Sequence, residues 1–338
     1  MSDAMWNRRQ WLTATLGTAT WEGVTLSAAS ASSDSSPSAP TTSAFRFCLN
    51  TSTVRDEQGR SRPLPELIRI AQQAGYDAIE PWTHEIEAYL SSGGTLPELR
   101  RRLEDAGLKM ADLIGFAEWI VADDSRRQKG LEQAKRYMDW AAQLGCPHLA
   151  APPVGATGGT SPRDDPRHSD PVTDLLTAAE RYHALVELGK PFRVVPLVEI
   201  WGFSRTLRRL GEAFFIAAES LQSQAAILPD VYHLYKGGSD FSGLPLLAPT
   251  AIGIFHFNDY PDIPRDKITD ADRVFPGDGI APLRQILKTL KTLGYSGYLS
   301  LELFNRTYWK QDPLHVAKTG LQKMRRLAAS ILSPDSGS

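Results

Sequence analysis

The sequence predicts an α/β protein folded as a single (β/α)8 TIM barrel. Short apolar or β-branched segments alternate with longer segments of helical periodicity from Ala44 onward, which is typical of parallel βα units. Eight strands within roughly 260 residues is the usual size of such a barrel, whose active site lies at the carboxyl ends of the strands. A doubly wound open sheet is the alternative fold. Five glycines that would cap helices in the left-handed conformation support the alternation: Gly75, Gly107, Gly145, Gly189 and Gly294.

The predicted elements follow in chain order. Strands are expected at residues 45–49, 78–80, 109–113, 148–151, 194–199, 225–228, 252–257 and 298–303. Helices with apolar residues at three- and four-residue spacing are expected at residues 65–74, 96–106, 128–144, 172–188, 206–220, 281–293 and 314–330. Two irregular segments, 152–171 and 235–249, follow strand ends, and only a short helix fits in the second. We expect both to form binding loops on the functional face.

The first part of the 338-residue chain differs in composition from the rest. Asn7-Arg8-Arg9-Gln10-Trp11-Leu12 resembles a twin-arginine export motif, and a weakly apolar stretch with a small-residue cleavage site at Ala29-Ser30-Ala31 follows it. The resemblance implies export of the folded protein to the periplasm or beyond. We therefore predict a signal peptide at 1–31, a disordered Ser- and Pro-rich linker at 32–43, the barrel at 44–330 and a disordered tail at 331–338.

Charge and apolar content argue against two classes of partner. With 37 Lys and Arg against 39 Asp and Glu, the net charge of −2 gives no basic field that would grip a nucleic acid backbone. No run of about eighteen apolar residues occurs, so the sequence predicts no stable membrane span. Cys48 and Cys146 fall toward opposite ends of the barrel and are expected to be buried and unpaired. A monomer and a homo-oligomer both stay open.

Polar residues at the carboxyl ends of the last four strands carry the strongest indication of function. Glu199, Asp230, His256 and Glu302 close or follow apolar segments, where an ionised side chain is costly unless it is paired or binds a metal. Taken singly, each has another explanation, such as a helix cap, a core histidine or an arginine pair. Together they predict a site for one divalent metal ion. Three carboxylates and one imidazole suit Mn²⁺, Mg²⁺ or Co²⁺, with Zn²⁺ as a further candidate.

Side chains near these positions are expected to bind a substrate. Four aromatic residues follow strand ends, where they would either stack on an apolar ring face or pack in the core: Trp82, Trp119, Trp201 and Phe203. Glu80 and Asp112, which end the second and third strands, are candidates for binding hydroxyl groups. Lys236 and Arg205 are either anion contacts or solvated charges. The late loops show no glycine-rich nest or basic cluster for a large phosphate, and the sequence does not decide whether the substrate is phosphorylated.

Three short elements extend the pattern of the strand-end residues. Asp230-Val231-Tyr232-His233 matches an Asp-x-x-His element, His256-Phe257-Asn258-Asp259 matches an element around a ligand histidine, and residues 273–279 match Arg-x-x-Pro-Gly-x-Gly. On these residues the chain resembles the xylose-isomerase-like family of sugar isomerases and epimerases over residues 44–329. The resemblance implies that the four strand-end residues hold the metal and that His233, Arg273 and Asp259 contact the substrate.

The resemblance also implies a metal-dependent sugar isomerase or epimerase that acts on a small sugar or keto-sugar. A carbon beside a carbonyl loses its proton more readily when a metal stabilises the developing enediolate. Glu199 and Glu302 would flank this carbon, one removing a proton and the other returning one. Reprotonation of the same carbon gives an epimer and reprotonation of its neighbour gives an isomer, and the sequence does not choose between them.

Three other functions stay open. A metal-dependent lyase or hydrolase of a keto-sugar or glycoside would use the same site for a different reaction. A nuclease like the apurinic-site endonucleases would need further histidines for three zinc ions, and Glu80, Asp112 and Val274 stand at those places. A sugar-binding protein with a vestigial metal site would bind without turnover.

Overall fold

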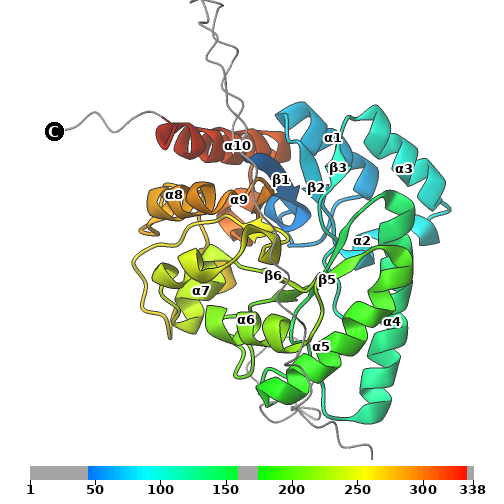
Figure 1. The fold of residues 1–338 in the computed structure, drawn as a ribbon. Helices are drawn as coiled ribbons and strands as arrows, with labels where there is room; N and C mark the ends of the chain where they lie inside the picture. The colour runs from blue at the N-terminus through cyan, green and yellow to red at the C-terminus, as the bar shows by residue number, and fades with distance from the viewer. Residues whose placement is uncertain (1–44, 159–173, 333–338) are drawn as a thin grey trace, which may run out of the picture. The chain divides into compact units, whose positions relative to one another are not determined.

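The computed structural model describes residues 45–158 and 174–332, in which parallel strands stand inside a layer of helices (Figure 1). All eight predicted strands are present in this part of the chain. The strands are β1 Arg46–Asn50, β2 Ala78–Glu80, β3 Lys109–Met110, β4 His148–Ala151, β5 Val195–Glu199, β6 Ala226–Leu228, β7 Phe255–His256 and β8 Tyr298–Leu301. Five of them are shorter than predicted, namely β3, β5, β6, β7 and β8; after Met110, for example, the chain leaves the ladder and only Ile114 pairs again.

The strands close into a parallel barrel. One ladder has the order β3-β2-β1-β8-β7 and the other has the order β4-β5-β6, and every pair is parallel. Isolated bridges from Ile114 to Ala150 and from Ile227 to Ile252 join the two ladders. The first strand pairs with the last, and these two bridges connect the two ladders to each other. The described sheet therefore has no open edge strand. The (β/α)8 prediction is confirmed, and the doubly wound alternative is wrong.

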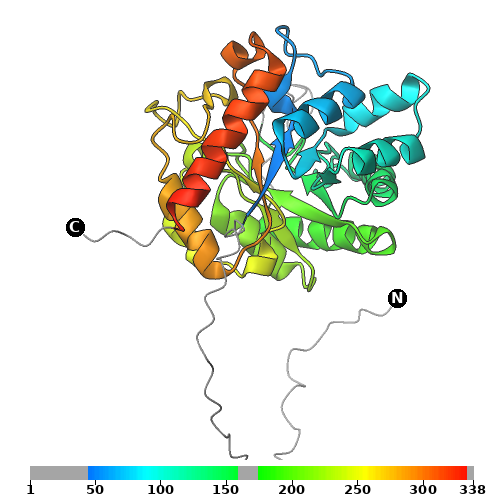
Figure 2. The ribbon, with the colours of Figure 1, turned by 90° about the horizontal axis from the view of Figure 1, so that it is seen from above.

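The helices lie outside the strands, and the seven predicted ones are all present. They are α1 Leu64–Ala74, α3 Leu96–Asp105, α4 Asp124–Leu144, α5 Leu175–Gly189, α6 Leu210–Glu219, α8 Leu283–Leu293 and α10 Pro313–Ser330. Figure 2 shows α10 in red beside α8, and α10 also packs against α1, so the last helix completes the helical layer. Three helices that follow strand ends were missed because they are too short to show a clear period: α2 Thr83–Ser91, α7 Val231–Gly237 and α9 Arg306–Trp309.

Four of the five predicted cap glycines have a positive φ, but Gly189 does not. It is the last residue of α5, with φ near −78°, and the chain turns instead at Arg193, whose φ is 56°. A Cβ atom on Gly189 would lie 2.2 Å from the carbonyl oxygen of Val194. This glycine is therefore needed for a close approach of helix and strand, and not for a left-handed cap.

Small side chains inside the barrel leave room for polar ones near its mouth. The interior cluster contains Cys48, Ala78, Ala111, Ala150 and Ala226 together with a few larger residues. Polar side chains with no exposed surface share this interior: Asn50, Glu80, Asp112, Asp230, His256 and Ser300. Buried polar groups of this kind must satisfy one another or bind a ligand, so the interior composition already marks the functional end of the barrel.

Several predictions about the rest of the chain have separate outcomes. Cys48 and Cys146 are buried and free, as predicted. None of the helices in the described segments is both long and apolar enough to cross a membrane. Ile331, assigned to the tail, is instead buried in the core, which extends the barrel beyond residue 330. The predicted signal peptide, the linker and residues 333–338 of the tail lie outside the described residues, as does much of the loop 152–171.

Candidate metal centre and active site

The four predicted metal ligands stand at the carboxyl ends of neighbouring strands. Glu199 is the last residue of β5 and His256 is the last residue of β7, while Glu302 directly follows β8. Asp230 caps α7, where its Oδ1 accepts a hydrogen bond from the backbone N–H of His233 at 2.8 Å. All four side chains are buried, with at most 3% of each residue exposed. The strand ends thus deliver three carboxyl groups and one imidazole to the barrel mouth.

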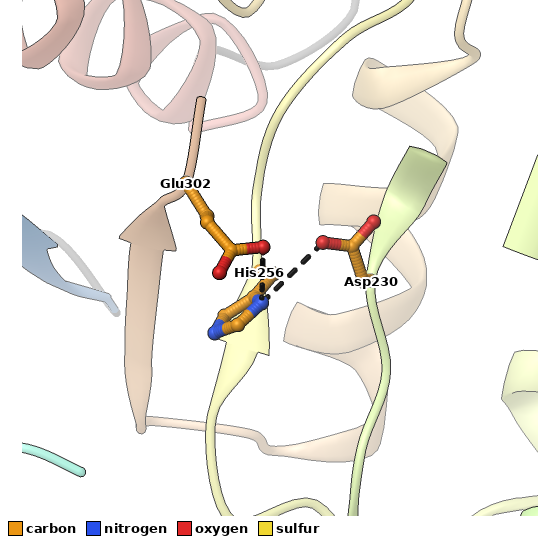
Figure 3. A group of neighbouring side chains, drawn as sticks. All are labelled: Asp230, His256 and Glu302. Carbon is orange, nitrogen blue, oxygen red and sulfur yellow. Dashed lines mark ion pairs between the residues drawn. The ribbon is translucent and has the colours of Figure 1, made fainter. Parts of the chain in front are cut away.

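Three of these residues converge on one point. Figure 3 shows the carboxyl groups of Asp230 and Glu302 both directed at the same ring nitrogen of His256. His256 Nδ1 lies 3.3 Å from Asp230 Oδ2 and 3.3 Å from Glu302 Oε2, and one ligand atom from each residue lies within 4.8 Å of the others. Within the described residues, Nδ1 has no hydrogen-bond partner. A buried ring nitrogen without a partner, beside two carboxylate oxygens, fits the requirements of a divalent metal ion.

Glu80 holds the other side of the His256 ring. His256 Nε2 lies 3.0 Å from Glu80 Oε1, and both side chains are fully buried. Glu80 Oε2 accepts hydrogen bonds from Asn50 Nδ2 at 2.9 Å and from Ser300 Oγ at 2.5 Å. Glu80, predicted to bind substrate hydroxyls, does not line the cavity, and both of its oxygens contact protein groups. With a metal bound, Nε2 would carry the proton that Glu80 accepts and Nδ1 would present its lone pair to the metal. Without a metal, burial alone would lower the pKa of His256, but the charges of Glu80 and Glu302 raise it well above its ordinary value.

Glu199 stands apart from the three converging residues. Its Oε1 accepts a hydrogen bond from Trp201 Nε1 at 3.1 Å, and its Oε2 is buried with no partner among the described residues. Burial, and then the charge of Glu302, raise the pKa of Glu199 to about 8. Burial alone would raise the pKa of Glu302 as well, but the charges of His256 and Arg273 lower it to about 2. The two predicted catalytic carboxyl groups are thus shifted in opposite directions.

Arg273 reaches the same oxygens that face His256. Its Nη1 donates to Asp230 Oδ2 at 2.9 Å and to Glu302 Oε2 at 2.7 Å, and its Nη2 pairs with Asp270 Oδ1 at 2.5 Å. Burial opposes ionisation of Asp230, yet the charge of Arg273 outweighs it and the pKa of Asp230 falls. Arg273 therefore keeps carboxylates ionised at the centre of the site. His233 lies beside it, with Nε2 3.0 Å from Arg273 Nη2 and with Nδ1 accepting from the N–H of Gly202.

A cavity of about 350 Å³ opens above this centre. Glu199, Glu302, His233 and Arg273 contribute its polar surface, while Trp82 and Trp201, both predicted substrate contacts, belong to its wall. Six further lining residues were not singled out as site residues from the sequence: Arg55, Ile114, Phe116, Asp270, Phe304 and Arg306. A signal existed for Phe304, which follows Glu302 by two residues just as Trp201 follows Glu199.

Two predicted substrate contacts have other roles in the structure. Trp119 is 1% exposed and does not line the cavity, because its Nε1 donates to the carbonyl oxygen of Pro152 and its ring packs against Tyr182. Asp259 accepts hydrogen bonds from the backbone N–H groups of Tyr260, Gly277, Gly279 and Ala281. Its carboxylate therefore fixes the loop that carries Arg273 and makes no contact with the cavity.

The remaining charged candidates also lie outside the cavity lining. Lys236 Nζ donates to the carbonyl oxygen of Ile268 at 2.8 Å, so it stabilises a loop. Asp112 is fully buried, and neither of its oxygens has a hydrogen-bond partner among the described residues. Burial, and then the charge of Glu80, raise the pKa of Asp112 well above its ordinary value. Arg205 lies next to Gly158 rather than at the metal centre.

Comparison with known proteins gives the same fold and a family. Residues 68–327 match the model of the xylose isomerase-like TIM barrel. The chain is 28% identical over 277 residues to an inosose isomerase of Halalkalibacterium halodurans, which covers 81% of this chain and 93% of that protein. It is 26% identical over 253 residues to a 3-dehydroshikimate dehydratase of Pseudomonas aeruginosa, which covers 72% of this chain and 37% of that protein. The zinc-bound crystal structure of IolI protein aligns with a TM-score of 0.75 at 22% identity, over 86% of this chain and 100% of that chain. The family match spans most of the barrel, and the chain belongs to the xylose isomerase-like TIM barrel family.

Proposed function

We propose that this protein is a divalent-metal-dependent sugar isomerase or epimerase, which moves a proton beside a carbonyl through an enediolate of its substrate. The observation that carries the proposal is the convergence of the carboxylates of Asp230 and Glu302, each 3.3 Å away, on the buried Nδ1 of His256, which makes no hydrogen bond within the described residues. Similarity to an inosose isomerase over 81% of the chain supports the reaction class. Family membership alone would not, because one fold serves many reactions.

The residues fit a bound metal ion. Asp230, His256 and Glu302 would hold it, and Glu199, whose Oε2 has no partner among the described residues, would complete the set. This donor set suits Mn²⁺, Mg²⁺ or Co²⁺, and Zn²⁺ is also compatible with it. When bound, the ion would withdraw charge from substrate oxygens and so lower the barrier to removing the adjacent proton.

The protein groups divide the proton transfer between two carboxyls. Glu302 and Glu199 would flank the reacting carbon, one removing a proton and the other returning one. In the metal-free site the charges of His256 and Arg273 keep Glu302 ionised, whereas burial raises the pKa of Glu199 to about 8. Such a pair, shifted in opposite directions, is the usual arrangement for acid and base roles at one site. Trp201 would fix the orientation of Glu199 through its Nε1–H. His233, which lines the cavity, would contact a substrate hydroxyl.

Proton exchange in heavy water tests this proposal. Metal-loaded protein is screened against ketoses and cyclic keto-polyols, and the wild type should place deuterium on the carbon beside the carbonyl. Glu199→Gln and Glu302→Gln should each lower turnover by about 10²–10⁴-fold, because the shape is kept and the proton acceptor is lost. Glu219→Gln, on the exposed face of α6, is the matched control and should have wild-type activity.

Two results would refute the mechanism. One is a true substrate that turns over with neither deuterium incorporation nor a primary isotope effect. The other is full activity in both glutamine variants at saturating metal. Metal content is measured for every variant, because either substitution also removes a ligand oxygen. A hydrolase or lyase would be recognised by release of a second product.

We also infer that residues 1–31 direct export. The Arg8-Arg9 pair, the apolar stretch and the Ala29-Ser30-Ala31 site occur in the order that such a signal needs. A reporter fused behind residues 1–43 should appear outside the cytoplasm, and Arg8→Lys together with Arg9→Lys should retain it inside. Export of the double variant at the wild-type level would exclude a twin-arginine signal.

A further inference from the structure

The outer part of the cavity contains positive charge that the metal centre does not use. Three arginines line the cavity: Arg55 after β1, Arg306 after β8 and Arg273 after β7. These strands are neighbours in the barrel, so the three arginines approach the mouth from adjacent sectors. The inference that follows rests on the proposed function, because it takes this cavity as the substrate site.

The inner arginine is already neutralised. Arg273 pairs with Asp230, Glu302 and Asp270 and is 1% exposed. A bound divalent ion together with Arg273 would balance the charges of the three carboxylates of the metal centre. Arg306, in contrast, is exposed at the start of α9 and forms no ion pair with any residue of the described segments. Its charge therefore remains available to a ligand.

Arg55 lies among three aromatic rings beside the cavity. Its Cζ lies 4.9 Å from the ring centroid of Trp82, 5.4 Å from that of Phe304 and 5.8 Å from that of Trp309. Stacking of this kind orders a guanidinium group before a ligand arrives. The charge of Arg55 also acts on Glu85, but burial raises the pKa of that carboxyl. Glu85 itself accepts from the Thr51 hydroxyl and from the N–H of Trp82.

Phe304 separates the inner from the outer arginines. Its ring centroid lies 5.4 Å from Arg55 Cζ and 5.0 Å from Arg273 Cζ. The wall then continues through neighbouring rings, with centroid separations of 5.2 Å from Trp82 to Phe116 and 5.8 Å from Phe116 to Trp201. An apolar wall of this length suits the face of a ring-shaped substrate, whereas a neutral sugar has no group that would pair with the outer arginines.

We propose that the substrate of this protein carries a carboxylate, which Arg306 and Arg55 bind at the outer end of the cavity while the metal centre acts on a keto or hydroxyl group at the other end. A guanidinium fork matches the planar carboxylate. Phosphate sites commonly add backbone N–H groups of a glycine-rich turn, and no lining residue of this cavity is a glycine. The sequence showed no basic cluster in the late loops because Arg55 comes from the first βα loop.

Binding of matched rings to the metal-loaded protein tests the proposal. Shikimate is a hydroxylated six-membered ring with a carboxylate, myo-inositol lacks the charge, and myo-inositol 1-phosphate carries a phosphate. By calorimetry at low salt, shikimate should bind about tenfold more tightly than myo-inositol. Arg306→Gln should remove most of this difference and leave myo-inositol unchanged, and Arg306→Lys should restore part of it. Arg55→Gln should act like Arg306→Gln. Arg101→Gln, an exposed arginine of α3 outside the cavity, is the control.

The outcomes separate this proposal from the proposed function. Equal binding of the two rings, equal losses for both in Arg306→Gln, or no binding of either anion would overturn the carboxylate site. Tighter binding of myo-inositol 1-phosphate than of shikimate through the same arginines would overturn it in favour of a phosphate. Shikimate binding that stays intact in Glu302→Gln, while this variant loses deuterium exchange, would support the carboxylate site independently of the metal centre. Turnover by the wild type with neither deuterium incorporation nor a primary isotope effect would refute only the proposed function.

Discussion

Replacing Glu80 should weaken metal binding although Glu80 is not a ligand. Its Oε1 fixes the ring of His256 through Nε2 at 3.0 Å, and its Oε2 accepts from Asn50 and Ser300. In Glu80→Ala, Nε2–H loses its acceptor and the ring is free to turn Nδ1 away from Asp230 and Glu302. Loss of a carboxylate behind a ligand histidine typically costs about 10- to 100-fold in metal affinity, and we expect the upper end of that range because the site is fully buried.

The glutamine variant, Glu80→Gln, should lie between the alanine variant and the wild type. The carbonyl of the new amide side chain would still accept from His256 Nε2, but its N–H₂ group would then face Asn50 Nδ2, also a donor. Asn50 is prevented from flipping because its Oδ1 accepts from Trp82 Nε1 at 3.0 Å. One acceptor is therefore lost, and we expect Glu80→Gln to weaken metal binding by about tenfold.

Cobalt titration measures both effects without any substrate. The visible absorption of bound Co²⁺ reports ligand geometry, and the titration gives the dissociation constant. Asp112→Asn is the matched control, because Asp112 is buried near Glu80 but makes no hydrogen bond to His256. A folded Glu80→Ala protein that binds Co²⁺ within about threefold of the wild type, with an unchanged spectrum, would refute the orienting role.

Three further predictions concern pH and stability. The pKa of Glu199 is raised to about 8 in the metal-free site, and the charges of Glu80 and Glu302 raise the pKa of His256, so metal binding at pH 7 should release protons from these two ligands and metal affinity should rise with pH. Calorimetry in two buffers of different ionisation enthalpy tests this, and no proton release would contradict it. Asp259→Ala should lower the free energy of unfolding by about 3 kcal/mol in denaturant melts, since four backbone N–H groups lose their acceptor, and a loss below about 1 kcal/mol would argue against this role. Gly189→Ala should lower the free energy of unfolding by about 2 kcal/mol, because the new Cβ would clash with the carbonyl oxygen of Val194. In the control Gly211→Ala, in α6, the new Cβ would meet nothing within 4 Å, so this free energy should be unchanged or raised. Equal effects of the two substitutions would contradict the close-contact argument.

The positions of the four strand-end residues follow from sequence alone. Parallel strands of a closed barrel all deliver their carboxyl ends to one face, so an apolar segment that ends in Glu199 or Glu302 places that residue near the mouth without further information. The positions of the strands in the chain were also predictable, because β propensity and the apolar character of a buried segment are local properties of the sequence. Short helices such as α2 and α9 were missed, since a few residues carry no measurable period.

Which neighbouring side chains join the site was decided only by the tertiary structure. Trp119 and Trp201 both follow strand ends, yet only Trp201 lines the cavity, because the loop after each strand sets the direction of the side chain. Glu80 meets His256 across 176 positions of the chain, and no local pattern encodes such a contact. Residue types at strand ends are thus determined by sequence, whereas their neighbours depend on loops that are distant in the sequence and adjacent in the barrel, as are the loops that carry Arg55 and Arg306.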